Sequence, residues 1–155
     1  MTNLYSRPAR DRQQPSLRVS ASEGIDSAER TVVLAHRSEA GPRVLGEAIK
    51  AARRERAALR VVHFARDMTA GPSMGEEAIE EIKALSRSIM AEGLEFEIQR
   101  ASDAVADQVL ELARDHGAEL IVLAARRRSP VMKLFLGSSA QRILLEADCP
   151  VLTVR

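Results

Sequence analysis

The sequence lacks tryptophan, and aromatic residues make up only 3% of it, although 45% of the residues are hydrophobic. A core built from this composition must consist mainly of Val, Leu, Ile and Ala, which suits helices packed on a parallel sheet. The single cysteine, Cys149, excludes an intrachain disulfide framework and is compatible with a reducing compartment. No apolar run is long enough to cross a membrane, and the amino terminus lacks the apolar core of a signal peptide. We therefore expect a cytoplasmic protein without membrane contact.

Net charge is also nearly absent, because 23 Lys and Arg residues face 22 Asp and Glu residues, for a formal charge of +1. Such a chain has no strong overall field to attract nucleic acid, so any basic site must be local. Residues 1–29 contain few large apolar side chains and are predicted to be a flexible tail, whereas residues 30–155 are predicted to form one domain. Four arginines in the first 20 residues leave open a nucleic-acid contact by the tail, although a solvated tail is the preferred interpretation.

The rest of the chain alternates strand patterns with helix patterns. Apolar or alternating segments predict five strands, at residues 31–35, 59–64, 94–100, 120–125 and 151–154. Apolar residues at helical spacing predict four helices between them, with Ser38 as a candidate cap of the first. This order requires right-handed crossovers, so we predict an α/β fold with an open, five-stranded parallel sheet and helices on both faces. The alternation in residues 94–100 predicts a half-exposed edge strand.

The most informative stretch lies near the carboxyl terminus. The apolar run Leu120–Ala125 ends at Arg126, Arg127 and Arg128, and Gly137, Ser138 and Ser139 then precede a helix. Open α/β sheets bind ligands at the carboxyl ends of their strands, where this basic segment must lie. Three interpretations stay open: a solvated turn, an anion or phosphate clamp formed with the helix amino terminus, and a contact with protein or nucleic acid on the rim.

Several other sites can be excluded. Gly41 and Gly46 have the spacing of a phosphate-binding P-loop, but Glu47 and Ala48 replace its lysine and hydroxyl residue. No G-x-G-x-x-G motif is present. The three histidines lack the spacing of a zinc site, so no metal is expected. Of these only His36 lies where a ligand would pass, at the end of the first strand, and a structural role is preferred for it.

Serines 138 and 139 have no base or orienting acid that the sequence reveals. We therefore predict no catalytic residues.

Four segments together resemble the universal stress protein family over residues 30–155. They are TVVLAHRSE, LRVVHF, ARDHGAELIVLAAR and LFLGSSAQRILLEADCPVLTVR. The resemblance implies a Rossmann-like sheet of the kind found in adenine nucleotide alpha hydrolases, with strand order 3-2-1-4-5. It also implies a homodimer through the last strand, formed by Val151, Leu152, Thr153 and Val154.

Family members that bind ATP carry the motif G-x2-G-x9-G-S/T after the fourth strand. By spacing, its first two glycines fall on Ala124 and Arg127, while Gly137 and Ser138 keep its end. The family's adenine-side aspartate falls on His36, the small residue after the second strand's histidine falls on Phe64, and a later hydroxyl falls on Ala140. Backbone glycines let a nucleotide approach closely, so their replacement predicts lost or weak ATP binding.

The resemblance thus implies a stress-response binding or regulatory module with an unidentified protein partner and no firmly bound cofactor, in which ATP or AMP binds weakly at most. The alternative is a nucleotide-binding member with weak ATPase or nucleotide-sensing activity. The candidate nucleotide or anion site comprises His36, Phe64, Ala124, Arg126, Arg127, Gly137, Ser138 and Ser139.

Overall fold

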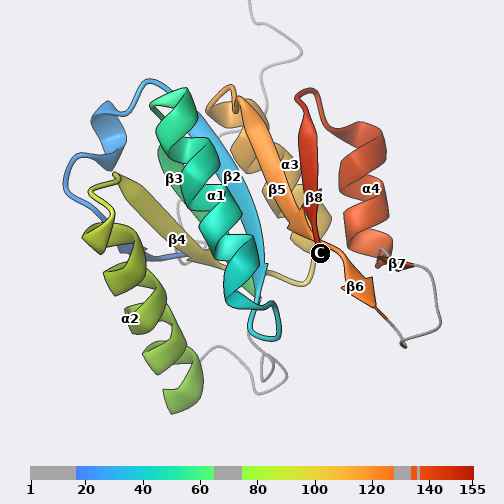
Figure 1. The fold of residues 1–155 in the computed structure, drawn as a ribbon, viewed down its shortest axis with the longest axis horizontal. Coiled ribbons are helices and arrows are strands. Elements are labelled where there is room, and N and C mark those ends of the chain that lie inside the picture. The colour runs from blue at the N-terminus through green and yellow to red at the C-terminus, as the bar shows by residue number, and fades with distance from the viewer. Residues whose placement is uncertain (1–16, 65–74, 128–133, 136) are drawn as a thin grey trace, which may run out of the picture.

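Six strands form one sheet in the order β1-β4-β3-β2-β5-β8, in a computed structural model that describes residues 17–64, 75–127, 134–135 and 137–155 (Figure 1). The strands are β1 (Arg18–Ala21), β2 (Thr31–Arg37), β3 (Ala58–Phe64), β4 (Phe96–Arg100), β5 (Leu120–Ala124) and β8 (Val151–Val154). All five predicted strands are present and pair parallel with one another, in the predicted order. The α/β fold is confirmed, but the predicted count of five strands is one too few, because β1 adds an antiparallel strand beside β4.

Within the described residues, four α-helices cover the sheet from both sides, as predicted. They are α1 (Pro42–Glu55), α2 (Glu76–Ala91), α3 (Val105–Asp115) and α4 (Ser138–Glu146). One apolar cluster joins α1 and α2 to strand residues such as Leu34 and Val61, and a second joins α3 and α4 to residues such as Val33 and Leu123. Because alternate residues of a strand face opposite sides, each central strand contributes to both clusters. The core therefore has two layers, one on each face of the sheet.

The prediction of a flexible tail over residues 1–29 is wrong for the last part of that range. Residues Arg18–Ala21 form β1, and the short 3-10 helix η1 (Ile25–Ser27) places the buried side chain of Ile25 against the sheet. The sequence RVSA is too short and polar to stand out as a strand, yet the ladder of β4 supplies partners for its backbone. Residues 1–16 of the predicted tail lie outside the described residues.

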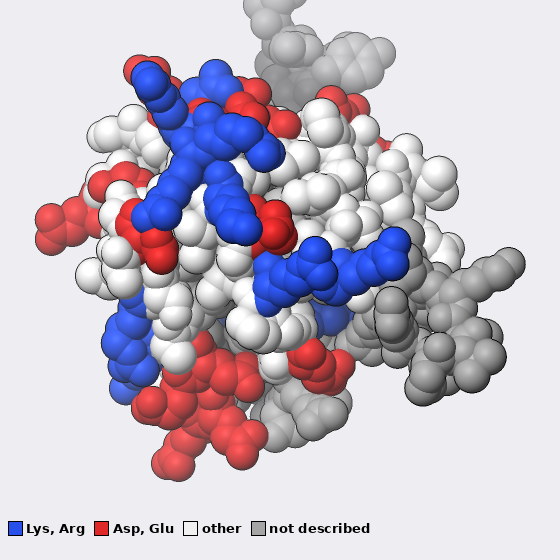
Figure 2. Space-filling model, viewed as in Figure 1, with Lys and Arg blue, Asp and Glu red and all other residues white. Residues whose placement is uncertain are grey.

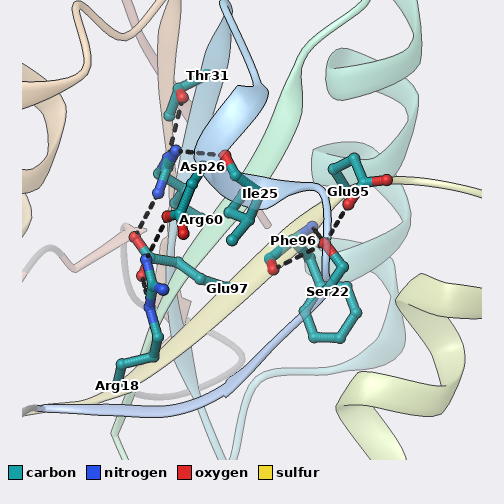
Figure 3. A network of polar contacts seen from close by, with 9 residues as sticks. All are labelled: Arg18, Ser22, Ile25, Asp26, Thr31, Arg60, Glu95, Phe96 and Glu97. Atoms are coloured by element: carbon teal, nitrogen blue, oxygen red, sulfur yellow. Dashed lines mark hydrogen bonds and ion pairs between the residues drawn. The ribbon is translucent and has the colours of Figure 1, made fainter.

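The addition of β1 also corrects the prediction for residues 94–100. β4 is covered on its outer side, so Phe96, Glu97 and Ile98 are buried rather than half exposed. Glu97 is tolerated there because Arg60 Nη1 donates to its Oε1 at 2.8 Å and Arg18 Nε donates to its Oε2 at 2.7 Å (Figure 3). Arg60 also donates to the hydroxyl of Thr31 and the carbonyl of Ile25. A buried charge needs such partners, and this network connects β1 and η1 to the centre of the sheet.

The connection after β5 contains a two-stranded hairpin. Strand β6 (Arg126–Arg127) pairs antiparallel with β7 (Leu134–Phe135), so the first two predicted loop arginines belong to a strand instead. Arg128, Ser129 and Pro130, also predicted to form this basic loop, lie outside the described residues.

Ser38 does not cap α1, which begins after Gly41 without a side-chain cap. Its hydroxyl donates instead to Glu81 of α2 at 2.6 Å and lies 3.2 Å from the carbonyl oxygen of Phe64.

Both signs of charge occur on the face seen in Figure 2, where acidic side chains gather over the lower part of α2 and basic side chains gather over the upper end of α1. Among the described residues, no helix is long and apolar enough to span a bilayer.

Candidate nucleotide site

The candidate site lies where the chain order reverses, between the neighbouring strands β2 and β5. The connection after β2 leads into α1 on one face of the sheet, and α4 lies on the other face. Crevices at such switch points are where open α/β sheets bind ligands. A cavity of about 200 Å³ opens at this end of the sheet. It is lined by Ala35, His36, Arg37, Val62, Phe64, Asp103, Val105, Leu123, Ala124, Ser139, Ala140 and Ile143.

Four predicted site residues thus line one cavity, although they come from three strands and a helix. They are His36 of β2, Phe64 of β3, Ala124 of β5 and Ser139 of α4. Ala140, the position of the family's later hydroxyl, lines it too.

Gly137 and Ser138 begin α4 at the same end of the sheet, and Ser138 is exposed. Arg126 and Arg127 follow Ala124 closely, and their backbones pair with Phe135 and Leu134 in the hairpin.

Arg37 is a residue of the site that the sequence pattern did not reveal. Its guanidinium carbon lies 5.5 Å from the centre of the Phe64 ring, close enough for a cation–π interaction. Its Nη2 atom is 3.7 Å from where a Cβ on Gly137 would stand, so it also approaches the amino terminus of α4. The strand register pairs Arg37 with Phe64, but the first predicted strand ends at residue 35, so aligning the ends of the predicted strands does not find this pairing.

A second unpredicted feature is a chain of hydrogen bonds that begins at His36. Its Nδ1 lies 2.9 Å from Nδ1 of His63, and the Nε2 of His63 lies 3.0 Å from Oε2 of Glu81. The same carboxylate oxygen accepts the hydroxyl of Ser38 at 2.6 Å. No sequence signal distinguishes Glu81, because it reads as one of several charged residues on the solvent face of α2. We call these four residues the histidine relay: His36, His63, Glu81 and Ser38.

Both imidazole rings of the histidine relay are uncharged at neutral pH. Burial, followed by the charge of His63, lowers the pKa of His36 to about 4. Burial also lowers the pKa of His63, and the hydrogen bond to Glu81 only partly opposes this effect. Burial alone would raise the pKa of Glu81, but hydrogen bonds from Ser38 and His63 outweigh it and lower that pKa. At neutral pH the relay therefore holds two uncharged imidazoles and one carboxylate.

Comparisons with known proteins show the family of the chain. The family model described as "Universal stress protein family" matches residues 29–155. The chain belongs to the universal stress protein family. A universal stress protein of Mycolicibacterium smegmatis is 42% identical over 76 residues, which are 48% of this chain and 58% of that protein. The chain thus matches little more than half the length of this curated relative.

Solved universal stress proteins match over a larger share. The structure of one from Archaeoglobus fulgidus is 30% identical with a TM-score of 0.61, covering 81% of this chain and 98% of that one. A structure of the universal stress protein from the same organism in complex with dAMP is 26% identical with a TM-score of 0.58, again covering 81% and 98%. Four cavity positions at which this sequence departs from the pattern expected of ATP-binding universal stress proteins therefore lie on a family scaffold: His36, Phe64, Ala124 and Ala140.

Proposed function

We propose that the protein is a cytoplasmic binding and regulatory module of the stress response whose adenine-nucleotide site has been weakened. The observation that carries this proposal is the pairing of Arg37 with Phe64 at the cavity. Two large side chains occupy space at the end of β2 and β3, and the remaining cavity measures about 200 Å³. Ligand sites for drug-sized molecules usually measure roughly 300–1,000 Å³, so this cavity by itself is small for a nucleotide. A second cavity of about 430 Å³ shares Arg37 and Ala124 with it.

The family relationship supports a nucleotide as the ligand class. The A. fulgidus universal stress protein solved in complex with dAMP is 26% identical to this chain. The scaffold that would hold such a ligand is retained here, since Gly137 still precedes α4 and Ser139 and Ala124 line the cavity. We therefore expect the mononucleotide AMP to bind weakly and ATP to bind more weakly still, because side chains stand at Ala124 and Arg127 where the glycines of the triphosphate loop would let the backbone approach the phosphates.

Titration with ATP and AMP tests this function. Calorimetry and nucleotide-dependent thermal shift are measured for the unmodified protein and for the double variant Ala124→Gly, Arg127→Gly. We expect millimolar or unmeasurable ATP affinity in the unmodified protein and a clear gain in the double variant, because restored glycines let the backbone approach the phosphates. The proposal is wrong if the unmodified protein binds ATP with micromolar affinity.

One observation favours the alternative, an ATP-binding protein with weak ATPase or nucleotide-sensing activity. Arg37 brings a guanidinium close to Gly137, where the amino terminus of α4 already favours negative charge. This arginine could compensate for the lost glycines by pairing with a phosphate. Arg37→Ala separates the two functions: it weakens ATP binding if the arginine holds phosphate and strengthens it if the arginine only blocks the cavity.

We also propose that two copies pair through β8. This strand ends the sheet next to β5, and Leu152 on it is 36% exposed. An uncovered strand edge at the border of a sheet is a template for pairing with another chain. A homodimer would cover this edge and double the number of regulatory sites in one assembly.

A further inference from the structure

The contact between His36 and His63 restricts where protons can sit. The two Nδ1 atoms are 2.9 Å apart, whereas the ring centroids are 5.1 Å apart, so the rings meet at their nitrogen-bearing edges. A hydrogen bond at this distance needs one nitrogen with a proton and one without. The two neutral rings must therefore carry opposite tautomers, one protonated at Nδ1 and the other at Nε2.

Glu81 decides which ring has which tautomer. An ionised carboxylate only accepts hydrogen bonds, so the Nε2 of His63, 3.0 Å from Oε2 of Glu81, must carry its proton. The Nδ1 of His63 is then bare and accepts the proton of His36 Nδ1. It follows that the Nε2 of His36 carries no proton.

This last nitrogen is open to a ligand. Among the described residues, the Nε2 of His36 has no hydrogen-bond partner, and no fully buried side-chain nitrogen or oxygen is left without one. The Nε2 atom is therefore within reach of solvent, on a residue that lines the cavity. Its lone pair can accept an N–H or O–H group but cannot donate to a carbonyl or carboxylate oxygen.

We propose that His63 and Glu81 act as positioning residues that fix His36 as a hydrogen-bond acceptor for the ligand of this cavity. This inference rests on the proposed function, which makes the ligand a nucleotide. It adds that the cavity prefers a nucleotide that offers a hydrogen-bond donor to His36. Two parts of a nucleotide supply that chemistry here, the amino group of adenine and the 2′-hydroxyl of ribose. The neutral imidazole accepts a hydrogen bond from the donor without adding charge to the site. A carboxylate at this position would add a negative charge.

The tautomers are tested directly by long-range proton–nitrogen-15 spectra of the histidine side chains at neutral pH. The chain has three histidines, so a His116→Gln background leaves only the two rings of interest. We expect His36 to be protonated at Nδ1 and His63 at Nε2. Glu81→Ala removes the acceptor and should mix the tautomers of both rings, while Glu81→Gln, which keeps a carbonyl oxygen, should preserve them.

Glu80→Ala is the matched control, because Glu80 is a neighbouring glutamate of α2 that pairs with Lys83 at the surface. It should leave both ring spectra unchanged. A proton on Nε2 of His36 in the unmodified protein overturns the inference. So does a Glu81→Ala spectrum that matches the Glu80→Ala spectrum.

The ligand is tested by titrating AMP, dAMP and purine riboside monophosphate, which lacks the amino group. We expect AMP to shift the Nε2 resonance of His36. A nucleotide that lacks the group donating to this nitrogen should bind about fivefold more weakly than AMP, which corresponds to one ordinary hydrogen bond. A weaker purine riboside complex identifies the base as the source, and a weaker dAMP complex identifies the ribose. In Glu81→Ala this difference should fall below about twofold, because His36 then offers a mixture of donor and acceptor.

The outcomes separate the inference from the function on which it rests. If all three nucleotides bind equally, or bind without moving the His36 resonance, the selectivity is wrong and nucleotide binding stands. If none binds, the expected weak AMP binding and the selectivity are both wrong, while the spectra of the free protein still decide whether Glu81 fixes the tautomers.

Discussion

Arg60 and Glu97 form an ion pair in the middle of the sheet, with 2.8 Å between Nη1 and Oε1 and with both side chains only 2% exposed. Arg60 lies on β3 and Glu97 on β4, and the strand register places them directly beside one another. Arg18 completes the pair from β1 (Figure 3). These three residues hold the amino-terminal strand to a buried charged network, in addition to the apolar packing of Val19 and Ile25.

We predict that Glu97→Ala lowers the free energy of unfolding by about 3–5 kcal/mol, because it leaves Arg60 buried without its carboxylate. Urea denaturation measures this loss. Asp148→Ala is the control, since it removes an exposed partner of Arg114 and should cost less than about 1 kcal/mol. A loss in Glu97→Ala as small as in the control would mean that water or a rearranged side chain replaces the carboxylate easily.

Deleting residues 1–28 should expose the outer edge of β4 and promote aggregation, because β1 and η1 cover that edge. Hydrogen exchange at the amides of β4 should become faster, and light scattering should rise on mild heating. A deletion of residues 1–16 keeps β1 and serves as the control. Equal exchange rates in the two truncated proteins would show that β1 contributes little to the protection of β4.

The central fold could be predicted from the sequence because its strands have a distinctive local composition. Leu120–Ala124 is an unbroken apolar run, and helix patterns separate it from its neighbours in the chain. The residues that the sequence did not reveal share a different property: their role depends on partners far away in the chain. In the sequence, Arg60 looks like a polar position of a strand, and Glu81 looks like part of a solvated helix face. Only the fold brings Glu97 beside Arg60 and His63 beside Glu81. Such residues can be buried because they form ion pairs or hydrogen bonds with distant residues, and no local sequence pattern indicates those partners.

Phe64→Val should raise the affinity for adenine nucleotides about tenfold, because a smaller side chain enlarges the cavity and releases Arg37 from the ring. Calorimetry with AMP measures the change. Leu145→Val is a control of similar chemistry, since Leu145 is 86% exposed on α4 and does not line the cavity. Unchanged or weaker AMP binding by Phe64→Val would mean that the ring contributes to the site instead of obstructing it.

Stability should fall as the pH is lowered from about 6.5 towards 4, owing to the histidine relay. The folded-state pKa of His36 is about 4, below its ordinary value of 6.5, so in this window the unfolded chain binds a proton that the folded protein does not bind. His63, whose pKa is also lowered, acts in the same direction, and the lowered pKa of Glu81 extends the loss to more acidic pH. Thermal unfolding across this range measures the slope, which should be smaller in His36→Gln. An unchanged slope in that variant would assign the acid sensitivity to other groups.

Thr153→Pro should convert the proposed dimer into a monomer without unfolding the sheet. Ile121 of β5 donates its N–H to the carbonyl of Pro150, and Ala125 donates to the carbonyl of Val154. Because the backbone groups of successive strand residues point to opposite sides, those of Thr153 face away from β5, toward the free edge of β8. Proline at this position removes an outward N–H that a second copy would use, while the ladder to β5 stays intact. Light scattering coupled to gel filtration gives the mass, and Thr153→Val, which keeps the N–H, should remain dimeric. A monomeric mass for the unmodified protein would refute pairing through this edge, and a dimer that survives Thr153→Pro would place the interface on another surface.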